Sequence, residues 1–188
     1  MDRKKMKTMA KALHRSTGIV FLLTIISIIL YNRTSQGLFL TLAIAFGTTA
    51  YHFAMRLLVG WLFENIMHNH ADYTRKWYQL RPWERKFYAF CKVKQWKNKM
   101  PTYHPERFSP DQYTWEEIAH TMCQSELGHE TIAVLSFLPI AFAKWFGALP
   151  VFSITSVCAA VLDLLFVMMQ RYNRDRVVRM IRKKNINR

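Results

Sequence analysis

The chain alternates between long apolar blocks and basic stretches, and it does not mix the two at helical or strand spacing. A helix that crosses the apolar core of a bilayer needs about 20 residues, with a range of about 17 to 25. Four blocks reach or approach this length. The pattern therefore predicts an all-α polytopic membrane protein with a single membrane domain over residues 1–188. The expected spans cover residues 16–31, 38–63, 131–146 and 149–169.

Two connections between the expected spans are very short. Residues 32–37 separate the first two spans, and Gly147 and Ala148 separate the last two. Connections of this length join helices that run in opposite directions. We therefore expect the four helices to form two antiparallel hairpins.

The basic residues fall between the apolar blocks. The sequence holds 27 Lys and Arg against 12 Asp and Glu, a net charge of +15. A soluble nucleic-acid-binding protein would interleave basic and apolar residues, so we expect no nucleic-acid partner. All the basic residues except Arg33, Arg56 and Lys144 lie near a terminus or between the second and third spans. Cytoplasmic segments carry the excess of Lys and Arg. We therefore expect a bacterial plasma membrane protein with both termini in the cytoplasm.

The segment between the second and third spans, residues 64–130, is too long and too patterned for a bare loop. Between positions 77 and 96 it mixes aromatic residues with Lys and Arg. That combination is typical of helices that lie in the headgroup interface with their rings as anchors. We expect a cytoplasmic interfacial helical region here. A helix that includes Trp115 to Gln124 should follow, capped by Ser109 or Asp111.

Ionisable side chains inside a span are costly and usually functional. Arg56 in the second span and Asp163 in the fourth lie at a similar expected depth and carry opposite charges. They are a candidate ion pair, which is either part of a polar site or a structural clasp between helices. His52 precedes Arg56 by one helical turn and shares its face.

Three ionisable residues stand at the expected inner end of the third span: Glu126, His129 and Glu130. A spacing of three residues puts Glu126 and His129 on one helical face, and Glu130 lies beside them. A carboxylate next to an imidazole suits general base catalysis, because the acid orients the ring and raises its basicity. The alternative is a helix start, where acidic residues stay solvated and interact favourably with the helix dipole.

A second polar cluster, Gln170 to Arg174, stands where the fourth span leaves the membrane. Its arginines also fit a basic flank that stops translocation, an interpretation that explains Gln170 and Asn173 less well. His68 and His70 form only a two-histidine pair, and the three cysteines lack metal-ligand spacing, so we expect no metal. The chain contains no G-x-S-x-G, Walker or G-x-G-x-x-G motif.

Three motifs follow one another along the chain. They are Lys94-Gln-Trp-Lys-Asn-Lys-Met-Pro101, Glu126-Leu-Gly-His129 before a helix that contains Leu-Pro, and Gln170-Arg-Tyr-Asn-Arg174. In this order they resemble the glycosyl-diaponeurosporenoate acyltransferase family, known from staphyloxanthin biosynthesis, over about Trp77 to Arg179. The resemblance implies transfer of a fatty acyl group to a sugar hydroxyl on a membrane-embedded glycolipid. By position, Glu126 and His129 match the family's acid–histidine pair, and Gln170 to Arg174 match its basic terminal motif.

We therefore expect an acyltransferase of carotenoid biosynthesis that uses a cytoplasmic thioester such as acyl-CoA, a membrane lipid acceptor and no cofactor. The expected catalytic residues are Glu126, His129 and Glu130, with His129 as the base and either carboxylate orienting it. The expected substrate-binding residues are His52, Arg56, Lys94, Trp96, Lys97, Asp163, Gln170, Arg171, Tyr172, Asn173 and Arg174.

Within the binding set, Arg171 and Arg174 are expected to attract the donor's phosphates with the help of Lys94 and Lys97. Arg56, His52 and Asn173 are expected to bind the acceptor head group or to stabilise an oxyanion.

Two other functions are compatible with the same residues. A small lipid methyltransferase would bind S-adenosylmethionine on a similar helical frame. A non-catalytic membrane protein would bind anionic lipid or a partner through the basic aromatic loop, with Glu126 and His129 as a helix start. A homodimer is also compatible with the sequence.

Overall fold

The computed structural model describes residues 3–68 and 70–186, with side chains from Lys11 onward. In this part of the chain the regular elements are all helices, and none is a strand. Four helical stretches are long and apolar enough to cross a membrane, and they are Lys11–Thr34, Gly37–Met67, Trp115–Phe146 and Leu149–Ile186. The all-α class and the four candidate membrane helices expected from the sequence are confirmed.

The long helices extend beyond the expected spans. They are α1 (Arg3–Thr34), α2 (Gly37–Met67), α5 (Trp115–Leu135) and α7 (Leu149–Ile186). At 1.5 Å per residue, the 38 residues of α7 extend about 57 Å, whereas the apolar core of a bilayer is about 30 Å thick. The expected boundaries marked the ends of the apolar runs. The polar flanks of α1 and α7, residues 3–15 and 170–186, continue the same helices because they contain neither Pro nor Gly.

The third expected span, residues 131–146, is not a single helix. α5 ends at Leu135, and it is followed by the 3₁₀ helix η4 (Leu138–Phe142) and the short helix α6 (Ala143–Phe146). Pro139 explains the break, because proline has no N–H to donate to the carbonyl oxygen four residues earlier. That oxygen belongs to Leu135, and it accepts a hydrogen bond from the Tyr51 hydroxyl at 2.9 Å.

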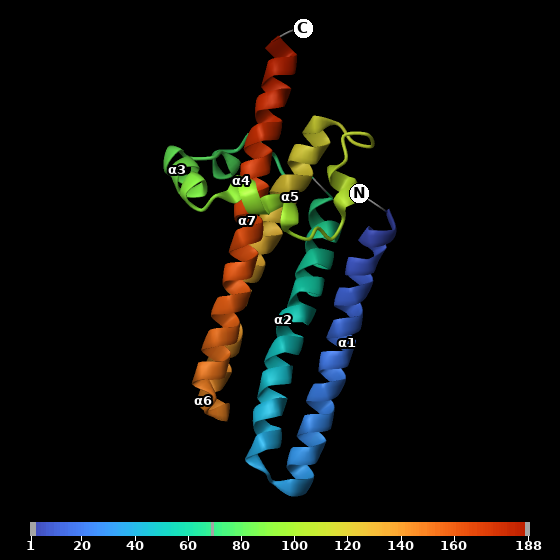
Figure 1. Ribbon diagram of the computed structural model, residues 1–188, viewed down its shortest axis with the longest axis vertical. Helices are drawn as coiled ribbons and strands as arrows, with labels where there is room; N and C mark the ends of the chain where they lie inside the picture. The colour runs from blue at the N-terminus through green and yellow to red at the C-terminus, as the bar shows by residue number, and fades with distance from the viewer. Residues whose placement is uncertain (1–2, 69, 187–188) are drawn as a thin grey trace. The chain divides into compact units, whose positions relative to one another are not determined.

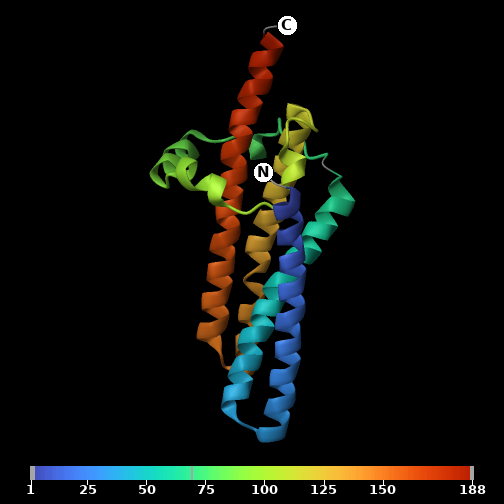
Figure 2. The same ribbon diagram turned by 45° about the vertical axis from the view of Figure 1, so that its right-hand side comes forward.

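The first of two compact units contains residues 1–60 and 131–162. In this unit α1 lies beside the first part of α2 (Figures 1 and 2). The outward side of α1 is apolar, with Phe21 61% exposed and Leu22 56% exposed. The hydroxyls of Thr17, Thr24 and Ser27 each donate to the backbone carbonyl oxygen four residues earlier. An apolar surface whose polar groups are satisfied within the helix suits a lipid environment.

The second unit contains residues 61–130 and 163–188. Its short elements are η1 (Lys76–Tyr78), α3 (Pro82–Phe90), α4 (Val93–Trp96), η2 (Lys97–Lys99) and η3 (Pro105–Phe108). A core of buried apolar side chains packs α5 against the last part of α7, and its members are Ile118, Ala119, Met122, Val177 and Ile181. This core holds the polar ends of both helices together.

α5 begins behind a capping box that consists of Thr114 and Glu117. The Glu117 N–H donates to Thr114 Oγ1 at 3.2 Å, and the Thr114 N–H donates to a Glu117 carboxylate oxygen at 2.8 Å. The expectation that Ser109 or Asp111 caps this helix was wrong. Both residues lie in the preceding turn, too far from Trp115 to reach the first unpaired N–H groups of the helix.

α3 exposes three aromatic side chains and buries a carboxylate. Its inward residues are Glu84 and Tyr88, which are 3% and 5% exposed. Its outward residues Trp83, Phe87 and Phe90 share one helical face and are 60%, 45% and 83% exposed. A helix on a soluble domain turns its aromatic side to the core.

Candidate functional site

An imidazole–carboxylate pair links α5 and α7 within the second unit. His129 Nδ1 lies 2.9 Å from Asp163 Oδ1. The His129 ring stacks on Phe166, with centroids 4.6 Å apart and planes 7° apart. Asp163 is 1% exposed, whereas the His129 side chain is 24% exposed. The pair is therefore anchored on its carboxylate side and open on its imidazole side.

The carboxylate that contacts His129 differs from the expected one. The sequence spacing suggested that Glu126 or Glu130 orients the ring, but the hydrogen-bonded carboxylate belongs to Asp163. Glu130 instead accepts a hydrogen bond from Trp77 Nε1 at 3.2 Å. Glu126 faces two arginines of α7. Of the three residues expected to be catalytic, only His129 takes part in an imidazole–carboxylate contact.

A carboxylate can only accept hydrogen bonds, so the Asp163 contact favours the tautomer with the proton on His129 Nδ1. The lone pair is then on Nε2, the nitrogen that a substrate hydroxyl can approach. Stacking on Phe166 limits rotation of the ring. This arrangement can remove a proton from a hydroxyl and stabilise the imidazolium that forms.

A second group of charges is buried close to the pair along both helices. Glu126 is 0% exposed and forms ion pairs with Arg174 and with Arg171, the latter at 3.0 Å. Arg171 also forms an ion pair with Glu84 of α3. Two carboxylates thus face two guanidinium groups, and the cluster is formally neutral. We call these four residues the charge cluster.

The charge cluster gives the two arginines a role that differs from the expected one. Arg174 is 1% exposed, and it also donates to the Tyr78 carbonyl oxygen. Arg171 donates to the Trp77 carbonyl oxygen. Each arginine donates to one carboxylate and to one backbone carbonyl oxygen, so both are poorly placed to attract the phosphates of a donor. They connect α7 to the segment that contains η1 and α3.

Two phenols pack against the charge cluster. Burial, together with the negative charge of nearby carboxylates, raises the pKa of Tyr78 to about 12 and that of Tyr88 to about 12. Both phenols therefore stay neutral and protonated at neutral pH. The Tyr78 ring also lies under the Arg174 guanidinium, with 5.0 Å between the guanidinium carbon and the ring centroid.

The remaining residues expected near the fourth span occupy two places in the second unit. Gln170 Nε2 donates to Ser125 Oγ at 3.1 Å, which links α7 to α5. Lys97 Nζ donates to Asn173 Oδ1 at 2.7 Å and lies 5.7 Å from the Tyr172 ring centroid.

Trp96 and Lys94, the other two residues of the first motif that we expected to bind substrate, have surroundings that differ from those of Lys97. Trp96 Nε1 donates to the Cys91 carbonyl oxygen at 2.9 Å, so it closes the turn between α3 and α4. Lys94 is exposed on α4.

The candidate residues of the second span belong to the first unit. His52 is buried, and Arg56 donates to the carbonyl oxygens of His52 and Ala159 at 3.2 and 3.3 Å. Because Arg56 and Asp163 fall in different units, the ion pair expected between them stays a prediction.

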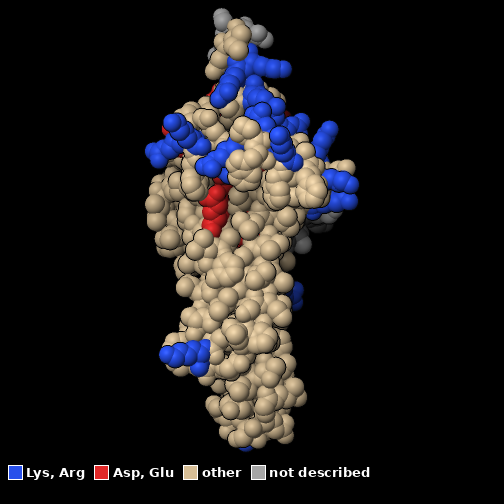
Figure 3. All heavy atoms as spheres, turned by 90° about the vertical axis from the view of Figure 1, so that its left-hand side faces the viewer, with Lys and Arg blue, Asp and Glu red and all other residues tan. Residues whose placement is uncertain are grey.

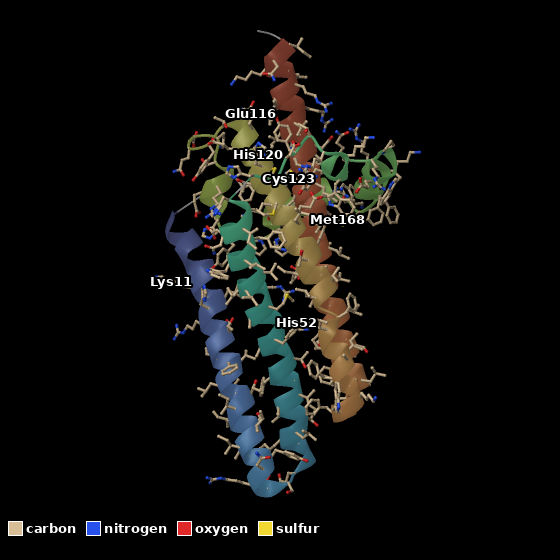
Figure 4. The ribbon with its side chains drawn as sticks, turned by 180° about the vertical axis from the view of Figure 1, so that it is seen from behind. Lys11, His52, Glu116, His120, Cys123 and Met168 are labelled. Carbon is tan, nitrogen blue, oxygen red and sulfur yellow. The ribbon has the colours of Figure 1, made fainter. Side chains whose placement is uncertain are left out.

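Figure 4 shows His120 and Cys123 on consecutive turns of α5. His120 Nδ1 lies 2.6 Å from the Ala71 carbonyl oxygen, and Cys123 is buried. At the loop start, His70 Nδ1 lies 2.8 Å from the His68 carbonyl oxygen. In the described residues, no group of three or more His, Cys, Asp or Glu side chains is placed to hold a metal ion.

Several residues of the site were not expected. Glu84 follows Pro82 by two positions and bonds the Arg81 N–H at 2.6 Å, so in the sequence it looks like an ordinary helix-capping residue. Phe166 is one apolar residue in a long apolar run. Neither position carries a local signal, because each acquires its partner through contacts across the fold.

Comparison with known proteins identifies one family. The model of the CrtO family, glycosyl-4,4'-diaponeurosporenoate acyltransferase, matches residues 74–183, more than half of the chain. The matched region contains the His129–Asp163 pair and the charge cluster. No curated protein and no solved structure matches the chain.

Proposed function

The chain belongs to the glycosyl-4,4'-diaponeurosporenoate acyltransferase family, and from this premise we propose that it transfers a fatty acyl group within the membrane. The donor is a cytoplasmic thioester such as acyl-CoA. The acceptor is a hydroxyl of a membrane-embedded glycolipid or isoprenoid glycoside. The members of this family are acyltransferases of carotenoid biosynthesis. The donor, the acceptor and the site belong to the proposal.

The His129–Asp163 contact is the observation that carries this proposal. His129 Nε2 takes the proton of the acceptor hydroxyl as the hydroxyl oxygen attacks the thioester carbonyl carbon. The carbon–sulfur bond then breaks, and the thiolate leaves with the proton that His129 returns. Asp163 is a positioning residue, because it acts on the substrate through His129. Atoms and charge balance without a further reactant.

The proposed topology follows from length and charge. The four long helices cross the membrane as two antiparallel hairpins, with both termini in the cytoplasm. Lys and Arg side chains gather over the second unit (Figure 3), as expected for cytoplasmic segments of a bacterial membrane protein. The donor would therefore approach His129 from the cytoplasm.

The exposed aromatic side chains of α3 support an interfacial position for residues 64–130. The aromatic face of Trp83, Phe87 and Phe90 would lie in the headgroup region, where aromatic rings are favoured. The buried face is anchored by the ion pair of Glu84 with Arg171. An exposed aromatic face of this kind would be unfavourable in water.

Single cysteines on α3 test the topology and the interface together. In a variant without native cysteines, Phe90→Cys should react with a membrane-impermeant maleimide in inverted vesicles but not in intact cells. It should react at least several-fold more slowly in vesicles than in detergent, because lipid covers the aromatic face. Ala89→Cys is the matched control, since Ala89 is exposed beside that face and should react at similar rates in both media.

Labelling in intact cells would overturn the cytoplasmic assignment. Equal rates for Phe90→Cys in vesicles and detergent would overturn the interfacial one.

The exposed aromatic face and the basic surface also favour a competing function, a non-catalytic protein that binds anionic lipid. The two functions differ in what His129 does. An acyltransferase needs its imidazole, whereas a lipid-binding protein needs only the surface of residues 64–130.

Comparative lipidomics separates these functions. Cells that express the wild type should accumulate an acylated glycolipid that is absent from cells expressing His129→Ala at the same membrane abundance. His104→Ala is the control, because His104 Nδ1 forms a similar 2.8 Å contact with Glu106 outside the proposed site. Identical lipid profiles for wild type and His129→Ala would reject catalysis and leave the lipid-binding function.

A further inference from the structure

An open pocket lies between α5 and the last part of α7, in the second unit. Its volume is about 230 Å³, and its lining residues are Met122, Asn173, Arg176, Val177 and Met180. Three of these side chains are apolar. The two polar lining residues are Asn173 and Arg176, which we call the polar rim.

Lys97 adds a second cation to this rim. Its Nζ donates to Asn173 Oδ1 at 2.7 Å, which fixes the ammonium group beside the pocket. Burial and then the charge of Arg176 lower the pKa of Lys97, so the two cations are close enough to repel one another. The rim concentrates positive charge at one place.

The carboxylates near this rim are already engaged. Asp175 forms ion pairs with Arg85 and Arg179. Glu126 and Glu84 belong to the charge cluster. Among the ion pairs of the described residues, none includes Lys97 or Arg176. The positive charge at the rim is thus available to an anion from outside the protein.

The position of the rim along α7 indicates which anion it suits. Arg176 follows Asp163 by 13 residues on one continuous helix, which corresponds to about 20 Å along the axis. A ligand that binds Lys97 and Arg176 through a phosphate and reaches the His129–Asp163 pair must therefore be extended. The pantetheine arm of an acyl thioester is an extended chain of comparable length, with phosphate at one end and the thioester at the other.

We propose that Lys97 and Arg176, above the pocket formed by Met122, Val177 and Met180, bind the phosphate of the phosphopantetheine arm of the donor. The inference rests on the proposed function, since it takes the thioester to be the acyl donor. It assigns phosphate binding to Lys97 and Arg176 in place of Arg171 and Arg174. A phospholipid head group offers the same phosphate chemistry, and the experiment separates the two sources.

Binding of a non-hydrolysable donor analogue tests the assignment. The full chain is placed in nanodiscs of phosphatidylcholine and titrated with the butyl thioether of coenzyme A. Arg176→Ala should weaken binding about tenfold, the loss expected for one charge-assisted contact with a phosphate. Arg182→Ala removes one exposed positive charge farther along α7 and should change the Kd less than twofold. The butyl thioether of pantetheine, which lacks phosphate, should bind wild type and Arg176→Ala equally.

Equal losses for Arg176→Ala and Arg182→Ala would overturn the assignment, because they would reflect net charge alone. A second titration uses nanodiscs that contain phosphatidylglycerol. If Arg176→Ala loses only its affinity for that lipid and keeps its affinity for the coenzyme A thioether, the phosphate belongs to a lipid and the assignment is wrong.

Turnover measurements separate this assignment from the proposed function. Arg176-dependent binding without any acyl transfer would reject the function but keep the site. Acyl transfer with an unchanged donor KM in Arg176→Ala would keep the function but reject the site.

Discussion

Replacement of Asp163 by asparagine is expected to slow acyl transfer by about 100- to 10,000-fold, the usual contribution of general base catalysis. The carboxamide has no negative charge to stabilise the imidazolium, and its NH₂ group can donate to His129 Nδ1. Donation to Nδ1 would place the ring proton on Nε2, where the proposed mechanism needs a lone pair. The measurement is the initial rate with labelled acyl-CoA and the acceptor found by lipidomics, for purified protein in nanodiscs.

The kinetic pattern distinguishes this role from general damage. Asp163→Asn should lower kcat while the donor KM stays within about twofold, since the phosphate contacts proposed for the donor lie elsewhere on α7. Glu106→Gln changes the carboxylate of the His104–Glu106 pair, and its rate should match that of the wild type. A near-normal kcat for Asp163→Asn would show that Asp163 does not position or charge-stabilise His129 during the reaction.

The second large effect concerns stability. Glu126→Gln is expected to lower the free energy of unfolding by about 3–5 kcal/mol, the cost of removing one partner from a buried ion pair. The amide keeps the shape of the side chain, but it removes the carboxylate that pairs with Arg174 and leaves Arg171 with Glu84 alone. Thermal and denaturant unfolding in detergent micelles measure the change. Glu116→Gln, at a half-buried position on the same helix, should cost less than about 1 kcal/mol.

A double replacement checks the cause of this loss. Glu126→Leu combined with Arg174→Met removes both charges of the most buried pair, and it should recover part of the stability lost in Glu126→Gln. If the double variant is the less stable of the two, packing around Glu126 outweighs its charge. If Glu126→Gln matches Glu116→Gln, the charge cluster does not stabilise the fold.

The helical class and the candidate membrane helices could be predicted because they depend on local properties. An apolar run of sufficient length must form a helix in lipid, where every backbone N–H and C=O group needs a partner within the chain. The ends of the helices were less predictable. The flank after residue 169 continues α7 because nothing in it stops a helix, whereas Pro139 stops α5 inside an apolar run.

Part of the candidate site could also be predicted, because that part depends on the spacing of residues within one helix. A spacing of three residues reveals neighbours on one helix, so Glu126 was a natural partner for His129, and Glu130 lies one turn after Glu126. Asp163 is 34 residues away in sequence and reaches His129 through the packing of α5 on α7. The burial of Arg174 could not be predicted either, because an arginine after an apolar run also fits a simple basic flank.

The partners of the two buried arginines set the order in which the second unit can be completed. Glu84, Glu126 and the carbonyl oxygens of Trp77 and Tyr78 are all synthesised before Arg171 and Arg174. Until the last part of α7 has been synthesised, Glu84 and Glu126 lack these cations. A nascent or truncated chain therefore has an incomplete polar core that quality-control proteases could recognise. The last part of α7 acts as the closing element of assembly.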